Sequence, residues 1–173
     1  KEVFARLADR AGEKGVRIAF ENCDMGGDWQ QGDCNIAFNP AAWDLMFDAV
    51  PSKALGVEYD PSHLIWQGID YIEVLKKYAD RLVHVHAKDT EIFYDKRDSV
   101  GIYGGGWWTY TIPGLGEIDW RLFINELHNL GYEGGVAIEH EDNRFAAWGD
   151  KRDMSKFEQG LRIGLTTLRS LMG

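Results

Sequence analysis

The stretch LVHVHAKD, residues 82–89, is a short apolar run that ends in charged side chains. Runs of this length with little polar interruption are typical of parallel strands covered on both faces. Three further runs have the same character: VRIAF at residues 16–20, ALGVEY at 54–59 and GVAI at 135–138. Helical segments separate the runs and hairpin signals are lacking, which predicts an α/β fold built on a parallel sheet.

Apolar residues at helical spacing predict one helix before the first run and one after each run. The expected helices cover residues 3–11, 40–50 and 69–78, a segment capped by Asp119, and a segment that begins near Ser155. Ser155 and Glu158 have the spacing of a capping box. The expected buried stripe of this last helix consists of Phe157, Leu161, Leu165, Leu168 and Met172.

Two architectures satisfy the alternation, an open doubly wound sheet and a segment of a barrel. An open nucleotide-binding sheet normally has a glycine-rich phosphate turn between a strand and a helix, and no strand end here has one. The glycine-rich stretch GIYGGGWW, residues 101–108, lies inside a long loop. A complete (β/α)8 barrel needs about 250 residues. The chain is therefore expected to be the C-terminal half of a (β/α)8 TIM barrel, strands five to eight, as a single partial barrel domain over residues 1–173.

Composition and sequence patterns limit the kinds of binding partner and the cellular location that we expect for the chain. The formal net charge is -9 and the basic residues are scattered, so nucleic acid is not expected as a partner. No apolar run approaches the roughly 20 residues that cross a bilayer, and the N-terminus lacks the layout of a signal peptide. A cytoplasmic protein without membrane contact is expected. Cys23 and Cys34 belong to no CxxC pair, and free thiols are expected rather than a disulfide.

A side chain that can bind a metal stands at the end of each apolar run. These side chains are Glu21, Asp60, His86 and Glu139. Each alone has a simpler interpretation, such as a helix cap or a hydrogen-bonded core histidine. Because the C-terminal ends of parallel barrel strands face the same rim, the repetition in four consecutive units predicts that they converge on one divalent metal ion. Three carboxylates and one imidazole favour Mn²⁺, with Mg²⁺, Co²⁺ or Zn²⁺ as alternatives.

The two histidines of the 82–86 run share one strand face, because side-chain direction repeats every second residue. His86 is nearer the rim and is the expected ligand. His84 lies one layer deeper and is expected to support His86 or to belong to the core.

Five segments resemble the xylose isomerase-like TIM barrel superfamily, which includes sugar phosphate isomerases and epimerases, inosose dehydratases and an endonuclease branch. They are IAFEN (18–22), EYDPSH (58–63), HVHAKD (84–89), PGLGEIDW (113–120) and AIEHED (137–142). The resemblance implies that the four strand-end residues hold the metal and that His63 contacts the substrate. It also implies that Glu21 and Glu139 act as base and acid through a metal-bound enediolate. The endonuclease branch uses many more histidines than the five of this chain.

The leading hypothesis for function is a divalent-metal-dependent isomerase or epimerase acting on a sugar or sugar phosphate. A lyase or dehydratase acting on a keto-sugar, an inosose or a 3-keto-glycoside is the alternative. The chain departs from ketose 3-epimerases after the metal histidine, where it has Ala87-Lys88-Asp89 and a long aromatic loop. Lys88 is expected either to face the enediolate or an anionic group of the substrate, or to be a solvated lysine.

Tryptophan is frequent in the segments expected to be loops, among them Trp29, Trp66, Trp107, Trp108 and Trp148. Aromatic faces on loops suit stacking against sugar rings, and capping of the core is the equal alternative. Trp66, Trp107 and Trp108 are the candidates for contact with a small carbohydrate substrate.

A half-barrel has open sheet edges and an uncovered interior, which favour self-association. A homodimer that supplies the missing strands is therefore expected. A hypothesis of another class is that the half-barrel is inactive alone and serves as a binding or assembly module.

Overall fold

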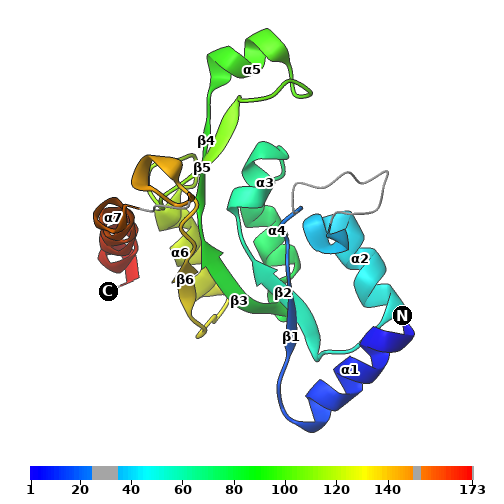
Figure 1. The fold of residues 1–173 in the computed structure, drawn as a ribbon. Coiled ribbons are helices and arrows are strands. Elements are labelled where there is room, and N and C mark those ends of the chain that lie inside the picture. Colours follow the sequence, from blue (N-terminus) through cyan, green and yellow to red (C-terminus); the bar gives the residue numbers. More distant parts are fainter. Residues whose placement is uncertain (25–34, 150–152, 173) are drawn as a thin grey trace.

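Four parallel strands form one sheet in the computed structural model of the chain, which describes residues 1–24, 35–149 and 153–172 (Figure 1). The strands β1 (Ile18–Glu21), β2 (Leu55–Tyr59), β3 (Leu82–Ala87) and β6 (Val136–Ile138) lie in this order across the sheet. All three pairings are parallel. The predicted α/β fold with a parallel sheet is confirmed, and each strand ends within one residue of its predicted end.

Five helices surround this sheet where the apolar spacing predicts them. They are α1 (Glu2–Glu13), α2 (Pro40–Ala49), α4 (Tyr71–Lys77), α6 (Trp120–Asn129) and α7 (Met154–Met172). The Asn39 side chain accepts a hydrogen bond from the Ala42 amide at the start of α2, and Asp119 accepts one from the Leu122 amide at the start of α6. Both caps satisfy amides that have no partner within the helix. Three short 3₁₀ turns, η1 (Ile36–Phe38), η2 (Ala79–Arg81) and η3 (Asn143–Phe145), complete the connections.

The two faces of the sheet differ. Alternate residues of β2 and β3, including Val57, Tyr59 and Val85, are buried in the hydrophobic core with the helices. Residues between them point to the opposite face and stay half-exposed: Glu58 and His86 are examples. In the described part of the chain the strands are thus not covered equally on both faces, which corrects the expectation from the apolar runs.

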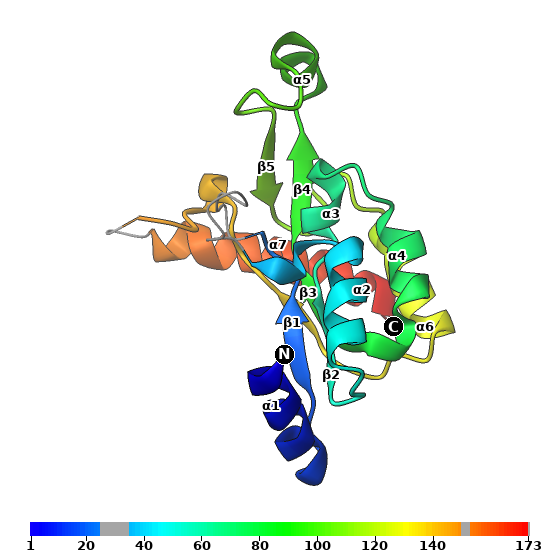
Figure 2. The same cartoon turned by 90° about the vertical axis from the view of Figure 1, so that its right-hand side faces the viewer.

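A projecting arm interrupts the predicted long loop after β3. Its two strands, β4 (Asp89–Ile92) and β5 (Trp108–Thr111), pair antiparallel, and the helix α5 (Tyr94–Val100) lies between them. Figures 1 and 2 show the arm extending away from the rest of the molecule. The expectation of no hairpin is wrong here, because a polar helix rather than a tight glycine turn connects the strands. A short helix, α3 (Ser62–Trp66), was also not predicted.

The last helix, α7, differs from its prediction in cap and in buried face. It is capped by Asp153, whose carboxylate accepts from the amides of Ser155 and Lys156, while Glu158 pairs with Arg162. The predicted Ser155–Glu158 capping box is therefore wrong.

The buried face of α7 consists of Gly160, Gly164 and Leu168. Leu165 and Met172 are 41% and 53% exposed, so their predicted burial is also wrong. A Cβ atom on Gly160 would lie 2.5 Å from His140 Nε2, and one on Gly164 would lie 3.2 Å from Pro113 Cδ. The glycines therefore allow an approach of the helix backbone that larger apolar residues would prevent.

Candidate metal and active site

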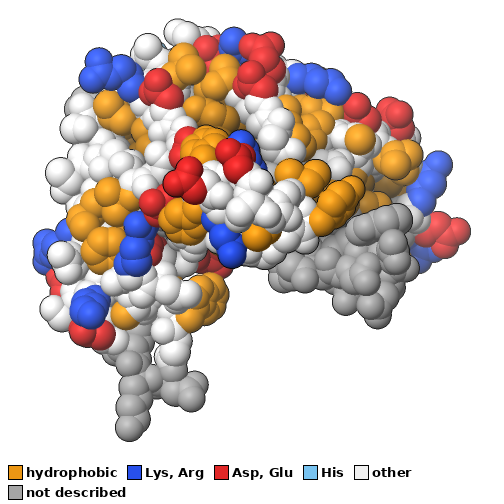
Figure 3. Space-filling model, turned by 90° about the horizontal axis from the view of Figure 1, so that it is seen from above, with side chains coloured by type: hydrophobic (Ala, Val, Ile, Leu, Met, Phe, Trp, Pro, Cys, Tyr) orange, Lys and Arg blue, Asp and Glu red, His pale blue; other side chains and the backbone are white. Residues whose placement is uncertain are grey.

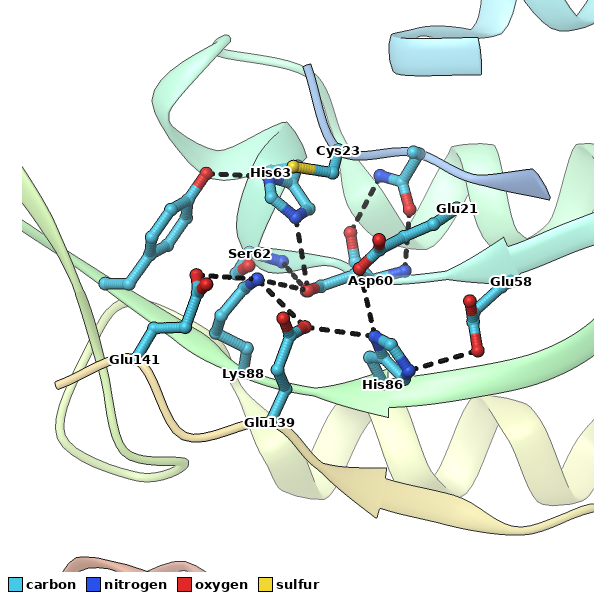
Figure 4. A network of polar contacts seen from close by, with 12 residues as sticks. Glu21, Cys23, Glu58, Asp60, Ser62, His63, His86, Lys88, Glu139 and Glu141 are labelled. Atoms are coloured by element: carbon cyan, nitrogen blue, oxygen red, sulfur yellow. Dashed lines mark hydrogen bonds and ion pairs between the residues drawn. The ribbon is translucent and has the colours of Figure 1, made fainter. Parts of the chain in front are cut away.

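Four side chains from four different segments meet at the C-terminal edge of the sheet (Figure 4). Glu21 is the last residue of β1 and His86 lies in β3, whereas Asp60 and Glu139 directly follow β2 and β6. Each residue offers one ligand atom, and these atoms all lie within 4.8 Å of one another. The parallel strands thus bring together the four residues that the sequence predicts as a metal-binding set.

The imidazole of His86 has carboxylates on both sides. Its Nδ1 lies 3.1 Å from Glu21 Oε1 and 3.0 Å from Glu139 Oε2, and its Nε2 lies 3.0 Å from Glu58 Oε1. Hydrogen bonds with Glu139 and Glu21 raise the pKa of His86 to about 10. In this arrangement the imidazole carries positive charge at neutral pH and balances part of the carboxylate charge.

Asp60 is fully buried and held from three directions. Asn22 bonds the backbone of Asp60 twice, through Nδ2 to the carbonyl at 2.8 Å and through Oδ1 from the amide at 2.7 Å. The side-chain Oδ1 of Asp60 accepts a hydrogen bond from the Ser62 amide at 2.9 Å. Burial, opposed mainly by the charge of Lys88, raises the pKa of the Asp60 carboxyl to about 6.

The second carboxylate oxygen of Asp60, Oδ2, accepts no hydrogen bond from the described residues. Lys88 Nζ lies 3.2 Å away and offsets the charge of this oxygen, but a buried oxygen without a hydrogen bond still has room for a further electrostatic partner. With two further carboxylates and an imidazole nitrogen within ligand distance of one another, the donor set fits a divalent cation that prefers oxygen and nitrogen.

Lys88 is a buried cation at the same edge, with its side chain 1% exposed. Its Nζ lies 3.2 Å from Asp60 Oδ2, 2.9 Å from Glu139 Oε2 and 3.0 Å from Glu141 Oε2. Burial opposes the charged form, but these carboxylates, led by Asp60, outweigh it and raise the pKa of Lys88. The alternative of a solvated lysine is wrong.

Glu139 contacts both cations of the site. Burial would raise the pKa of its carboxyl, but His86 and Lys88 together lower it to about 2. The side chains of Glu21 and Glu139 are 27% and 29% exposed, whereas that of Asp60 is fully buried. Of the three carboxylates, only these two are accessible to another molecule.

His63 joins this edge to the arm. Its Nε2 lies 3.4 Å from Asp60 Oδ2, and its Nδ1 lies 2.7 Å from the hydroxyl of Tyr110, which also accepts a hydrogen bond from Trp66 Nε1 at 3.3 Å. Burial, followed by the charge of Lys88, lowers the pKa of His63 to about 4. The ring is therefore neutral at pH 7.

The three tryptophans predicted to contact substrate differ in position. Trp66 and Trp108 are half-buried and stack with ring centroids 5.0 Å apart and planes 5° apart. Trp107 is buried, 6% exposed, and lines a cavity of about 570 Å³ on the arm together with Arg97 and Glu117. Trp148 is 60% exposed, and Trp29 lies outside the described residues.

Asp89 connects two of the segments quoted above, HVHAKD and PGLGEIDW, through hydrogen bonds. Its carboxylate accepts from the amides of Thr90, Gly114 and Ile118 and from Trp120 Nε1. The HVHAKD segment is thereby joined to the PGLGEIDW segment. This bonding anchors the base of the arm beside Lys88, a structural role that was not anticipated from the sequence.

Three further predictions concern the thiols, membrane-spanning helices and the distribution of basic side chains. Cys23 is half-buried, but Cys34 lies outside the described residues, so the thiol state stays a prediction. None of the described helices has the length and hydropathy needed to span a membrane. The Lys and Arg side chains visible in Figure 3 are scattered over that face and interspersed with acidic and apolar ones.

The chain is similar in sequence to one protein family and to curated relatives. The model of a family described as a xylose isomerase-like TIM barrel matches residues 1–170. An inosose dehydratase of Clostridium perfringens is 30% identical over 146 residues, which are 82% of this chain and 46% of that protein. The chain thus spans about half the length of the curated relative it matches.

Three solved structures share the fold. A xylose isomerase domain protein from Planctomyces limnophilus has a TM-score of 0.70 at 22% identity, over 98% of this chain and 51% of that one. For 3-keto-D-glucoside 4-epimerase, YcjR, from E. coli the TM-score is 0.62 at 19% identity, over 98% and 51%. The IOLI protein with a binding zinc atom has a TM-score of 0.62 at 21% identity, over 99% and 54%.

Proposed function

Since the chain belongs to the xylose isomerase-like TIM barrel family, we propose that it acts on a carbohydrate or cyclitol through one divalent metal ion held by its four strand-end residues. The observation that carries this proposal is the convergence of their ligand atoms within 4.8 Å, together with the buried Asp60 oxygen that accepts no hydrogen bond from a described residue. Mn²⁺ remains our first choice of ion, and the zinc in the IOLI protein structure supports Zn²⁺ as the alternative.

The proposed chemistry is removal of a proton from the carbon beside a carbonyl. A divalent cation would polarise that carbonyl and lower the pKa of the neighbouring C–H. Glu21 and Glu139 are the proposed proton carriers, because of the three carboxylates in the metal-binding set only these two are accessible to another molecule. Asp60 is too deeply buried for this role and serves as a ligand.

The remaining site residues are proposed to bind and orient the substrate. His63 is fully buried with Nε2 3.4 Å from Asp60 Oδ2, so it would orient this ligand rather than make the direct substrate contact predicted from the sequence. Lys88 would place positive charge near the oxygen on which negative charge develops. The stacked pair of Trp66 and Trp108 would present an aromatic surface beside His63. Trp107, which is buried, would act mainly by shaping the arm.

We favour elimination of water over isomerisation as the outcome. The support is the 30% identity to an inosose dehydratase, since the solved neighbours are more distant. Isomerisation or epimerisation is the second candidate. The observation in its favour is that two accessible carboxylates, Glu21 and Glu139, lie 3.1 and 3.0 Å from the same nitrogen of His86, so that one could remove a proton from a bound substrate and the other return it.

The test is incubation of the Mn²⁺- or Zn²⁺-loaded full chain with inososes, keto-sugars and 3-keto-glycosides in D₂O, followed by mass spectrometry. Loss of water from the substrate supports the dehydratase, whereas deuterium uptake without loss of mass indicates an isomerase or epimerase. Glu139→Gln, which keeps the shape of the side chain, should abolish both. Absence of exchange and of elimination with every substrate and ion would refute the proposed function.

We also propose that the four strands correspond to strands five to eight of a barrel. The support is the parallel order of the sheet and the coverage of about half of each related chain. An inactive binding or assembly module is the competing hypothesis, and the same incubation distinguishes it from an enzyme.

A further inference from the structure

Glu58 lies beside the metal-binding set without belonging to it. It is in β2, where Val57 and Tyr59 point into the core and Glu58 points to the opposite, half-exposed face. The pairing of β2 with β3 shifts register between Val57 and Glu58. Irregularities of this kind near active sites redirect a side chain, and here the Glu58 carboxylate reaches the ring of His86.

The two nitrogens of His86 face different groups. Nδ1 lies 3.1 Å from Glu21 Oε1 and 3.0 Å from Glu139 Oε2, so it points into the metal-binding set. Nε2 points the other way, 3.0 Å from Glu58 Oε1 (Figure 4). A neutral imidazole that binds a cation through one nitrogen carries its proton on the other, and that proton needs an acceptor.

We propose that Glu58 is a positioning residue that accepts the Nε2 proton of His86 and thereby directs Nδ1 to the metal ion. This inference rests on the metal centre of the proposed function. The carboxylate fixes which nitrogen carries the proton, holds the ring plane and makes Nδ1 a stronger electron donor. The quoted EYDPSH segment begins with Glu58, but the sequence predicts no role for this residue because it lies inside a strand rather than at its end.

His84 is the rival partner of His86. Glu58, His84 and His86 also place ligand atoms within 4.8 Å of one another, as a second cation site would require. The rings of His84 and His86 pack edge to face, and their centroids lie 5.7 Å apart. A second ion on Nε2 would occupy the nitrogen that our proposal assigns to the proton, so the two interpretations exclude each other.

The experiment measures the affinity and stoichiometry of Zn²⁺ and Mn²⁺ for the metal-free full chain, by calorimetry with chelator competition. We expect one ion per chain. Glu58→Leu should weaken binding about 10- to 100-fold, as loss of an outer hydrogen-bond acceptor typically does. Glu58→Gln should weaken it less, because its amide oxygen can still accept the proton. His84→Asn tests the rival second cation site and should leave the number of bound ions at one. Glu73→Gln, on the exposed surface of α4, is the matched control and should leave affinity unchanged.

A second measurement guards against a folding defect. Circular dichroism should match the parent chain for each variant, and ¹⁵N–¹H spectra of the Zn²⁺-loaded parent should show a protonated Nε2 on His86 whose shift moves in Glu58→Gln. Unchanged affinity in folded Glu58→Leu would overturn the proposal alone. Loss of one bound ion in His84→Asn would replace it with a second cation site. Failure of the parent chain to bind either ion would overturn both this inference and the proposed function.

Discussion

Loss of the Asp89 carboxylate should destabilise the fold. Its buried carboxylate is the acceptor for three backbone amides and one indole. Buried donors left without an acceptor cost about 1–3 kcal/mol each, partly relieved by water, so Asp89→Ala should lower the free energy of unfolding by about 4 kcal/mol. Urea denaturation measures this. The exposed Asp95→Ala is the matched control and should change stability by less than about 0.5 kcal/mol.

Tyr110 should control the orientation of His63. Its hydroxyl accepts from Trp66 and is therefore free to donate to His63 Nδ1, which leaves the ring proton on Nε2, toward Asp60. Tyr110→Phe keeps the ring, over which Lys88 Nζ lies at 4.6 Å. If the proposed activity holds, kcat should fall about tenfold, equivalent to about 1.4 kcal/mol, with KM little changed. A fall in KM and kcat together, or no effect, would contradict this role.

The residues of the site were predictable to different degrees. The four strand-end side chains could be predicted because a parallel sheet places all its C-terminal ends along one edge. Strand alternation places Glu58 on the face of the site, but its contact with His86 depends on the pairing of β2 with β3, whose register shift leaves no mark in the sequence. Tyr110 could not be predicted either, because its contact with His63 depends on an arm that the sequence does not predict.

Gly160 in α7 is expected to tolerate no larger side chain. A Cβ on Gly160 would also lie 2.9 Å from Phe145 Cβ, so steric overlap should outweigh the helix propensity of alanine. Gly160→Ala should therefore destabilise the chain by about 1–3 kcal/mol. The matched control is Gly12→Ala in α1, where no atom lies within 4 Å of the added Cβ, and stability should rise by up to about 1 kcal/mol. Thermal melts of the two variants should move in opposite directions.

The strands and the long helices agree with their predictions, because burial of one face makes apolar residues recur with the period of a strand or a helix. The arm was missed because most of its connection is polar and its strands are only four residues long. The start of α7 agrees with the prediction of a helix that begins near Ser155, but its cap does not, because Asp153 rather than Ser155 provides the side-chain acceptor. Periodicity alone could not reveal either feature.

Apolar side chains gather along the side of the molecule formed by α1, β1 and α2. Exposed residues there include Val3, Phe4, Leu7, Ile36 and Leu45, and a cavity of about 540 Å³ opens between Phe4, Phe20 and Leu45. Surfaces of this character mark association sites. We expect the chain by itself to form a homodimer through this side. Sedimentation should show a dimer that Phe4→Ser with Leu45→Ser converts to monomer, whereas Leu122→Ser, on exposed α6 surface, should not. A stable monomeric parent chain with a cooperative melt would contradict this expectation.

Lys88 has a practical consequence for handling the protein. Its ammonium group neutralises carboxylates contributed by the segments after β2 and β6, so their mutual repulsion is relieved by the polypeptide itself. Purification in EDTA should consequently yield soluble material with an unchanged far-ultraviolet spectrum, ready for reconstitution with an ion of choice. Lys88→Met should precipitate or unfold under the same treatment, because Asp60, Glu139 and Glu141 would lose the ammonium group that contacts all three.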